Sequence, residues 1–365
     1  MGVLKSLPVV MNHYVNEVAW RMTVSPACFE DQCRNLAERG LRGIGLDEAE
    51  AYLLDGAGLP ENSLLLTFDD GYLDNYFYAL PSLYKYGHNA VCFPVADRLE
   101  AREEARAPLD AVLSGRAAVP DGVARPLRRT PQGFTVRKDI FLGRAEARAM
   151  DASGIFRIAS HCRGHYGVYT GPGYRDFFRP RTQLRTFYRR EEEPVWGMPD
   201  FPVKPGLRFR AFIPNPDMVE EIKRLVPQDF DAAAEFFAGQ SGPADLRALL
   251  AAYKKRMGRR ETDAERRERM WREIGLGKEE LEAILGHKVQ SLCWPWGRYC
   301  EEARQLAVDA GFKVFFIVFG GANPPGRPGA VHRFENSNRG GTWLATQARL
   351  HMSPLAAGLL ALVGR

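Results

Sequence analysis

The stretch 63–72, "SLLLTFDDGY", decides how this chain is expected to fold. Its first six residues form a continuous apolar run, which is typical of a strand buried on both faces of a parallel sheet. The run leads directly into two adjacent carboxylates, Asp69 and Asp70, and Gly71 then permits a sharp turn. Taken alone, such an aspartate pair more often forms a turn than a catalytic or metal-binding site, so a functional role can be predicted only with other residues of the sequence.

Alternating strand and helix signals surround this stretch. The expected strands are 7–15, 43–46, 63–68, 89–95, 156–160, 289–296, 313–319 and 331–335. Helical patterns fall between them; the first opens with Ser25 as N-cap and Pro26 in the first turn, and Asp47 is expected to cap the second. Repeated βα units of this kind predict an α/β fold with a parallel sheet or barrel.

Two segments interrupt this rhythm. Residues 99–140 are rich in proline and arginine, and residues 166–275 are irregular and partly helical. We interpret 1–365 as a single barrel domain that carries these two insertions and ends in a helical tail at 340–365.

Charge restricts the class of partner. Fifty Lys and Arg against forty-five Asp and Glu leave a net charge of +5, too small to indicate nucleic acid. The chain from Arg98 to Arg210 is arginine-rich, which would suit an anionic substrate or membrane phosphate, although a solvated surface is the commoner reason. The apolar run 355–363 is too short to span a bilayer and is expected to dock on the domain or touch a membrane surface. The oligomeric state is not predicted.

The spacing of the cysteines and the sequence of the N-terminus both favour a location in the cytoplasm. None of the six cysteines forms a C-x-x-C pair, as expected for reduced thiols. The first fifteen residues contain no apolar run long enough for a signal-peptide core, so secretion is not expected. The prediction is a cytoplasmic protein that could work at the inner membrane surface.

A second polar cluster follows another expected strand. In "IASHCRGH" (158–165), His161 and His165 are four residues apart, a spacing that lets two imidazoles meet one metal ion. With an aspartate at the end of a neighbouring strand, they would form a two-His, one-carboxylate set that leaves metal positions open for water.

Three segments together resemble a known family. The segments are, in order, "LLLTFDDGYLDNYFYALPSLYKYGHNAVCFPV" (64–95), "IASHCRGH" (158–165) and "SLCWPWGRY" (291–299). They resemble the first three motifs of the polysaccharide deacetylases of carbohydrate esterase family 4, which remove N- or O-acetyl groups from sugars. The resemblance covers roughly 1–98, 141–166 and 276–335, and implies an irregular (β/α) barrel with its site at the C-terminal face.

The resemblance also implies roles for individual residues. Asp69 would be the general base, and Asp70 a metal ligand beside His161 and His165. The metal in such enzymes is zinc or another divalent ion, with cobalt, nickel and manganese as alternatives. A metal-activated water would then attack the acetamide carbonyl after Asp69 takes its proton.

Further contacts to the substrate are expected around the third motif. The resemblance assigns the backbone N–H of Trp296 to the developing oxyanion. Tyr72, Trp294 and Pro295 are the candidates for substrate binding, although tryptophan side chains belong equally often to a core.

The general acid is left open among three histidines. His13 ends the first strand, resembling the strand end of many bacterial members, and a barrel would aim it at the mouth of the site. His351 in "LHMSP" and His332 are the alternatives, and His13 is preferred.

One departure from the family pattern bears on activity. The third motif usually begins with an arginine thought to orient the base, but here Cys293 stands in its place, and no D-x-x-D-W motif is visible. The leading hypothesis is a metal-dependent deacetylase acting on an N-acetylated sugar of a bacterial envelope glycan, glycolipid or lipid-linked precursor. The alternatives are a catalytically inactive glycan-binding or scaffold protein on the same fold, and a metal hydrolase acting on a non-sugar amide.

Overall fold

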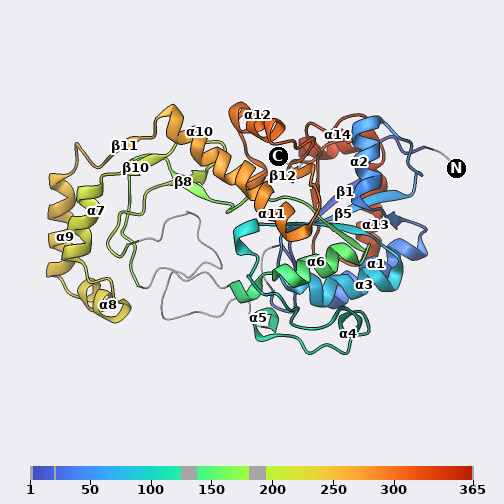
Figure 1. Cartoon of the computed structure of the whole chain (residues 1–365), viewed down its shortest axis with the longest axis horizontal. Coiled ribbons are helices and arrows are strands. Elements are labelled where there is room, and N and C mark those ends of the chain that lie inside the picture. The colour runs from blue at the N-terminus through green and yellow to red at the C-terminus, as the bar shows by residue number, and fades with distance from the viewer. Residues whose placement is uncertain (1–2, 20–21, 125–137, 181–194, 364–365) are drawn as a thin grey trace.

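A ring of parallel strands forms the centre of the molecule (Figure 1). The structure is a computed structural model and describes residues 3–19, 22–124, 138–180 and 195–363. One side of the ring is a continuous sheet, because neighbouring strands pair in parallel. Its order is β14 (Phe334–Glu335), β1 (Val9–Asn12), β5 (Ser63–Asp70), β6 (Ala90–Pro94) and β7 (Phe156–Ile158), with β4 (Arg42–Gly43) beside β5.

Two isolated bridges close this sheet into a barrel. Ser160, just after β7, pairs in parallel with Leu292 of β12 (Ser291–Cys293). Strand β12 pairs with β13 (Val314–Phe316), and Phe316 pairs with Val331, three residues before β14. The predicted irregular (β/α) barrel is therefore confirmed, although its later strands are shorter than the apolar runs that predicted them.

Helices surround the ring (Figure 1). They are α1 (Pro26–Glu38), α2 (Leu46–Asp55), α3 (Leu80–Tyr86) after the π turn Asn75–Ala79, α6 (Arg144–Ala152), α11 (Gly277–Leu285), α12 (Glu301–Asp309) and α13 (Gly341–His351). Ser25 caps α1 as predicted, since its hydroxyl accepts from the Cys28 N–H. The cap of α2 was predicted at Asp47 but lies at Gly45, whose N–H donates to the Glu48 carboxylate.

The described residues of 166–275 form an arm beside the barrel (Figure 1). In these residues the arm contains two antiparallel ribbons and four α-helices. They are β8 (Gly167–Tyr169) with β9 (Val203–Pro205), β10 (Phe212–Pro214) with β11 (Gly258–Arg260), α7 (Pro216–Leu225), α8 (Phe230–Ala238), α9 (Ser241–Ala252) and α10 (Asp263–Trp271). Most of its buried apolar residues, such as Met218 and Leu246, form a cluster separate from the barrel core, whereas Leu207, Met270 and Ile274 belong to the barrel core. The part of its arginine-rich run at 181–194 lies outside the described residues.

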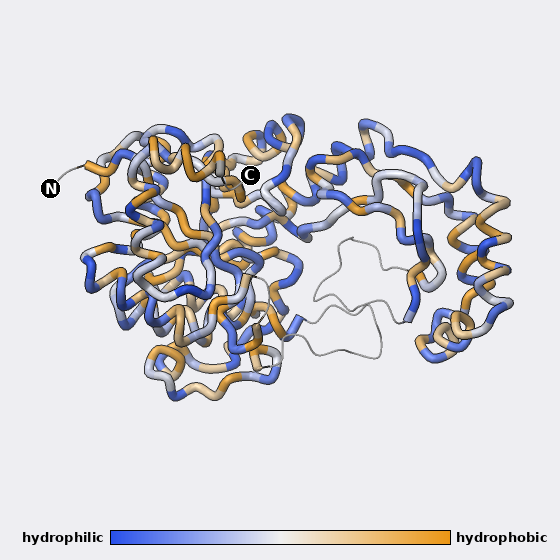
Figure 2. The backbone as a smooth tube through the Cα atoms, turned by 180° about the vertical axis from the view of Figure 1, so that it is seen from behind, coloured by the Kyte–Doolittle hydropathy of each residue, from blue (hydrophilic) through white to orange (hydrophobic). Residues whose placement is uncertain are grey.

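The other insertion and the tail are smaller. Between 99 and 140 the structure describes α4 (Leu109–Leu113) and α5 (Asp121–Ala124), while 125–137 lie outside the described residues. The chain ends in α13 and α14 (Pro354–Val363), and the backbone near that end is coloured as largely hydrophobic in Figure 2. Among the described residues, no helix is both long and apolar enough to cross a membrane.

Candidate metal and catalytic site

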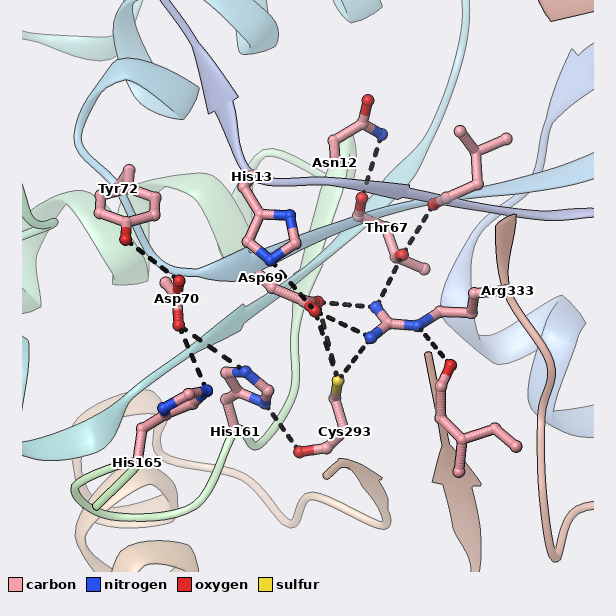
Figure 3. A network of polar contacts seen from close by, with 12 residues as sticks. Asn12, His13, Thr67, Asp69, Asp70, Tyr72, His161, His165, Cys293 and Arg333 are labelled. Atoms are coloured by element: carbon pink, nitrogen blue, oxygen red, sulfur yellow. Dashed lines mark hydrogen bonds and ion pairs between the residues drawn. The ribbon is translucent and has the colours of Figure 1, made fainter. Parts of the chain in front are cut away.

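The polar residues singled out in the sequence meet at one end of the barrel (Figure 3). Asp69 and Asp70 end β5, and His161 and His165 follow β7. The carboxyl ends of parallel strands lie at the same rim, so residues distant in the sequence come together there.

The backbone is unusual at this rim. Of the described non-glycine residues with positive φ, all but Met22 lie here: Asp70, Cys162, His165 and Trp296. Positive φ is unfavourable for side chains other than glycine, and such residues concentrate at functional sites. Gly71 is required for a different reason, because a Cβ at this position would lie 2.5 Å from Cβ of Pro94.

Asp70, His161 and His165 form a buried group with metal-ligand geometry. Their ligand atoms all lie within 4.8 Å of one another. Oδ1 of Asp70 is 3.7 Å from Nε2 of His161 and 3.9 Å from Nε2 of His165, too far for hydrogen bonds. This buried oxygen has no hydrogen-bond partner among the described residues, a costly state that a bound cation would relieve. The residues present therefore fit a metal ion.

Contacts and burial keep the two candidate histidine ligands neutral, and a hydrogen bond orients His161. Nδ1 of His161 lies 2.7 Å from the carbonyl oxygen of Cys293, so Nδ1–H donates and the Nε2 lone pair faces Asp70. Burial lowers the pKa of His161 and lowers that of His165 to about 3, which keeps both imidazoles in the neutral form that binds metals.

Tyr72 has a different position from the one predicted. It was expected to bind substrate, but its side chain is buried, and its ring stacks between those of Tyr14 and Phe141. Its hydroxyl donates to Oδ2 of Asp70 at 3.1 Å. Tyr72 therefore orients the carboxylate of Asp70 from behind the site.

Arg333 binds the proposed base, and the sequence analysis missed it. Its Nη1 and Nη2 donate to Oδ1 and Oδ2 of Asp69 at 2.7 and 2.8 Å, and Nη2 also contacts Sγ of Cys293 at 3.0 Å (Figure 3). Burial alone would raise the pKa of Asp69, but the Arg333 guanidinium outweighs burial and holds this pKa well below its usual range. The site thus has an arginine on its carboxylate even though Cys293 occupies the expected arginine position.

A second buried arginine lies beside the ligand group. Nη1 of Arg98 is 3.9 Å from Oδ1 of Asp70, and Nη2 donates to the carbonyl oxygen of Gly164 at 2.8 Å. Arg98 thereby ties the segment that carries the two histidines to the region after β6 (η2, Ala96–Arg98). Nothing in the sequence distinguished it from the other arginines of this region.

Of the three candidate general acids, His13 lies at the site. Its Nε2 is 3.9 Å from Oδ2 of Asp69, and its side chain is 13% exposed. The ring of His351 stacks on Phe334 with Nδ1 at the Gln347 carbonyl, and Nδ1 of His332 faces the Phe319 carbonyl. Of these three histidines, all of which the structure describes, only His13 contacts the Asp69 carboxylate.

The tryptophan motif divides between site and core. The half-buried ring of Trp296 lies 4.2 Å from that of His165. Trp294 is fully buried and stacks on Tyr299 and Phe315, and Pro295 is buried beside it. The prediction that Trp294 and Pro295 contact substrate is therefore corrected, because their side chains pack inside the protein.

Known proteins resemble this chain in sequence. Residues 56–192 match the family model of the polysaccharide deacetylases. A putative polysaccharide deacetylase of Bacillus subtilis, YxkH, is 35% identical over 89 residues, which are 24% of this chain. The matched part is 32% of that curated relative's length.

Solved structures share the fold over nearly the whole chain. A de-N-acetylase from Aggregatibacter actinomycetemcomitans superposes with a TM-score of 0.60 at 18% identity, covering 93% of this chain and 99% of its own. The deacetylase domain of BpsB from Bordetella bronchiseptica gives 0.56 at 19% identity, covering 90% and 95%. IcaB from Ammonifex degensii gives 0.53 at 18% identity, covering 94% and 97%. Residues 56–192 thus resemble the polysaccharide deacetylases in sequence, and the chain as a whole has the barrel fold of solved deacetylase structures.

Proposed function

We propose that this protein is a metal-dependent deacetylase that hydrolyses the acetamide of an N-acetylated sugar. One observation carries the proposal. Arg333 keeps the carboxylate of Asp69 ionised, and this carboxylate lies beside a buried ligand group in which Oδ1 of Asp70 has no hydrogen-bond partner among the described residues. A base next to a metal position is the arrangement that metal-assisted hydrolysis requires.

The ligand group would hold a divalent ion through Asp70, His161 and His165. Two imidazoles and one carboxylate suit zinc, and cobalt, nickel and manganese accept the same donors. When bound, such an ion supplies a Lewis acid that acidifies water and polarises the acetyl carbonyl.

The protein's own groups would then move the protons. Asp69 accepts the proton of the attacking water, and the two hydrogen bonds from Arg333 hold its carboxylate in one orientation. His13, the histidine beside Asp69, donates a proton to the departing amine. The backbone N–H of Trp296 would stabilise the oxyanion, and its ring would form one wall of the substrate position next to His165.

The substrate that we propose is an acetylated sugar of a bacterial envelope glycan, glycolipid or lipid-linked precursor. The match of residues 56–192 to the polysaccharide deacetylases supports an acetylated glycan. The free thiols support the cytoplasm as the place of action, where an envelope intermediate is encountered before export.

The first experiment measures bound metal and released acetate on the same samples. We expect near-stoichiometric metal in the wild type, with both metal and acetate release lost in Asp70→Ala and His165→Ala. Asp69→Asn should keep the metal and lose acetate release. Asp69 lies outside the Asp70, His161 and His165 group, and although it forms a second possible group with His161 and Cys293, Arg333 already binds both of its oxygens. Wild-type protein that purifies without metal and gains no activity on addition of zinc, cobalt, nickel or manganese would contradict the proposal.

A set of histidine variants tests the general acid. His13→Ala should lower acetate release by about 10²-fold or more, the usual contribution of a positioned proton donor. His351→Ala and His332→Ala serve as matched controls and should retain the wild-type rate, because their rings contact other parts of the protein. A rate that falls in a control but not in His13→Ala would reassign the acid.

The alternative of an inactive glycan-binding protein rested on the missing arginine at position 293. Because Arg333, directly before β14, contacts the same carboxylate, that argument no longer favours it. A metal-loaded wild type that binds acetylated glycans without releasing acetate would restore this alternative. A panel of acetylated sugars and acylated amines separates the third candidate, a hydrolase of non-sugar amides.

A further inference from the structure

The C-terminal helix α14 exposes large apolar residues to solvent and buries a small one. Leu355, Leu359 and Leu362 are 83%, 65% and 68% exposed, whereas Ala357 is fully buried. The three leucines follow the spacing i, i+4, i+7, so they form one stripe along the helix. A helix that packs only against its own domain usually buries leucine and exposes smaller or polar residues, and the described residues leave this stripe without an apolar partner.

The sequence around α14 is strongly basic. From Gly311 to Arg365 the only acidic residue is Glu335. Apart from Arg333, which is buried and paired with Asp69, the basic residues are Lys313, Arg327, Arg339, Arg349 and Arg365. This balance differs from that of the whole chain, in which fifty basic residues face forty-five acidic ones. A surface with this composition attracts an anionic partner.

We propose that the leucine stripe of α14 inserts into the interface of an anionic lipid bilayer. Helices that lie in a bilayer surface combine an apolar stripe with basic surroundings, and both features occur here. A second copy of this chain fits less well, because it would bring two basic surfaces together. Three leucines also offer far less than the roughly 800 Å² per partner of a standard protein interface.

The stripe is connected to the rim of the candidate site. A Cβ at Gly320 would lie 3.7 Å from Ala361 of α14, so the two backbones are in close contact. The next residue, Phe319, is 36% exposed, and the Arg298 guanidinium lies 4.5 Å from the centre of its ring. Arg298 follows two residues after Trp296, whose ring lies against His165. Docking through α14 would therefore bring this side of the rim towards the bilayer.

Vesicle sedimentation of the full chain tests the proposal directly. Vesicles of phosphatidylcholine alone are compared with vesicles containing about one third phosphatidylglycerol. We expect binding to the anionic vesicles that weakens with salt, and at least tenfold weaker binding for the triple variant Leu355→Ser, Leu359→Ser, Leu362→Ser. Because these side chains are exposed, the variant should fold normally, and circular dichroism verifies this.

A matched control replaces three exposed apolar residues elsewhere, Val3→Ser, Val119→Ser and Val308→Ser, and should bind vesicles as the wild type does. Wild-type protein that binds neither vesicle would overturn the proposal, as would equal loss in the control. A dimer that the leucine variant dissociates, without vesicle binding, would overturn it in favour of a second copy. Acetate release from a water-soluble substrate is measured separately, so failure of the proposed deacetylase function would not be confused with failure of membrane binding.

Discussion

Arg333 is the residue on which the candidate site most depends. Its two nitrogens hold both oxygens of Asp69, and both side chains are almost completely buried. Removing one member of such a pair leaves a buried charge without its partner, which costs about 3–5 kcal/mol. The arginine thus affects both the stability of the barrel and the protonation of the proposed base.

We therefore expect Arg333→Met to lower acetate release by about 10²-fold or more at neutral pH. Without the guanidinium the pKa of Asp69 rises, so the base stays protonated to higher pH and the acid limb of the pH–rate profile moves upward. Arg333→Lys keeps the charge and should restore part of this shift. A melting curve shows whether each variant is folded, and an unchanged acid limb in folded Arg333→Met would contradict the assigned role.

Asp74 provides a prediction about stability and pH. Its side chain is buried and accepts from the side-chain amides of Asn16 and Asn75, and burial raises its pKa to about 8. The folded state therefore binds a proton that the unfolded state releases near pH 4. This contribution to the free energy of unfolding is present at low pH and decreases between about pH 4 and pH 8, by at most about 1.4 kcal/mol per pH unit.

Urea unfolding of wild type and Asp74→Asn at several pH values measures this contribution. The difference in free energy of unfolding between the two proteins should change in favour of Asp74→Asn as the pH rises from 5 to 8. A difference that is constant over this range would show that Asp74 does not titrate there.

At the scale of elements, the end of β5 places both carboxylates. Asp70 and Gly71 have φ of 69° and 75°, so the chain leaves the strand in a left-handed turn beside Pro94. The pair of negative charges lies at the strand end because this turn lets Asp69 face Arg333 while Asp70 faces the histidines.

Gly71→Ala should destabilise the protein and impair the site together. The new Cβ would lie 2.5 Å from Cβ and 2.9 Å from Cα of Pro94, and the positive φ is itself unfavourable. We expect a loss of about 1–3 kcal/mol of stability and weaker metal retention, measured by chemical unfolding and metal analysis. Gly87→Ala is the matched control, since it shares a positive φ but has nothing within 4 Å of its Cβ position. If both variants retain metal equally, the close approach to Pro94 does not position Asp70.

The sequence predicted these elements unevenly. The apolar run before Asp69 and the Ser25 cap rest on local patterns, and both predictions are confirmed. The N-cap of α2 is Gly45, because the Glu48 carboxylate accepts a hydrogen bond from the Gly45 N–H. The sequence did not distinguish this arrangement from a cap at Asp47, because aspartate is itself a common N-cap residue. Arg333 could not be assigned because its contact with Asp69 joins residues 264 positions apart, and no local pattern reports such a pairing.

At the scale of the whole molecule, the barrel and the arm have separate apolar cores. The sequence predicted an insertion at 166–275 from the break in strand and helix rhythm. It could not show the separate core, because residues such as Tyr169, Phe201 and Met218 come from segments without a common period. Burial of Trp294 and Tyr72 was undetermined for a related reason, since tryptophan and tyrosine occur both in cores and in binding sites.

The separate cores predict that the arm can be weakened without loss of the metal site. Met218 is fully buried in the arm, so Met218→Ala should cost about 2–5 kcal/mol there. Hydrogen exchange should become faster in α7 and α9, while the metal content of the protein and exchange in β5 stay unchanged. Loss of bound metal in this variant would show that the two cores are coupled.

The contact of Arg333 with both Asp69 and Cys293 has a consequence for the evolutionary history of the site. The guanidinium lies 3.0 Å from Sγ of Cys293, so a second arginine at position 293 would meet it as a like charge in a buried space. Only one of the positions 293 and 333 is therefore expected to hold an arginine beside Asp69. Related sequences should carry arginine at one of them but rarely at both. A lineage that moved this cation from one position to the other would have had to change both positions together, so we expect the two positions to covary.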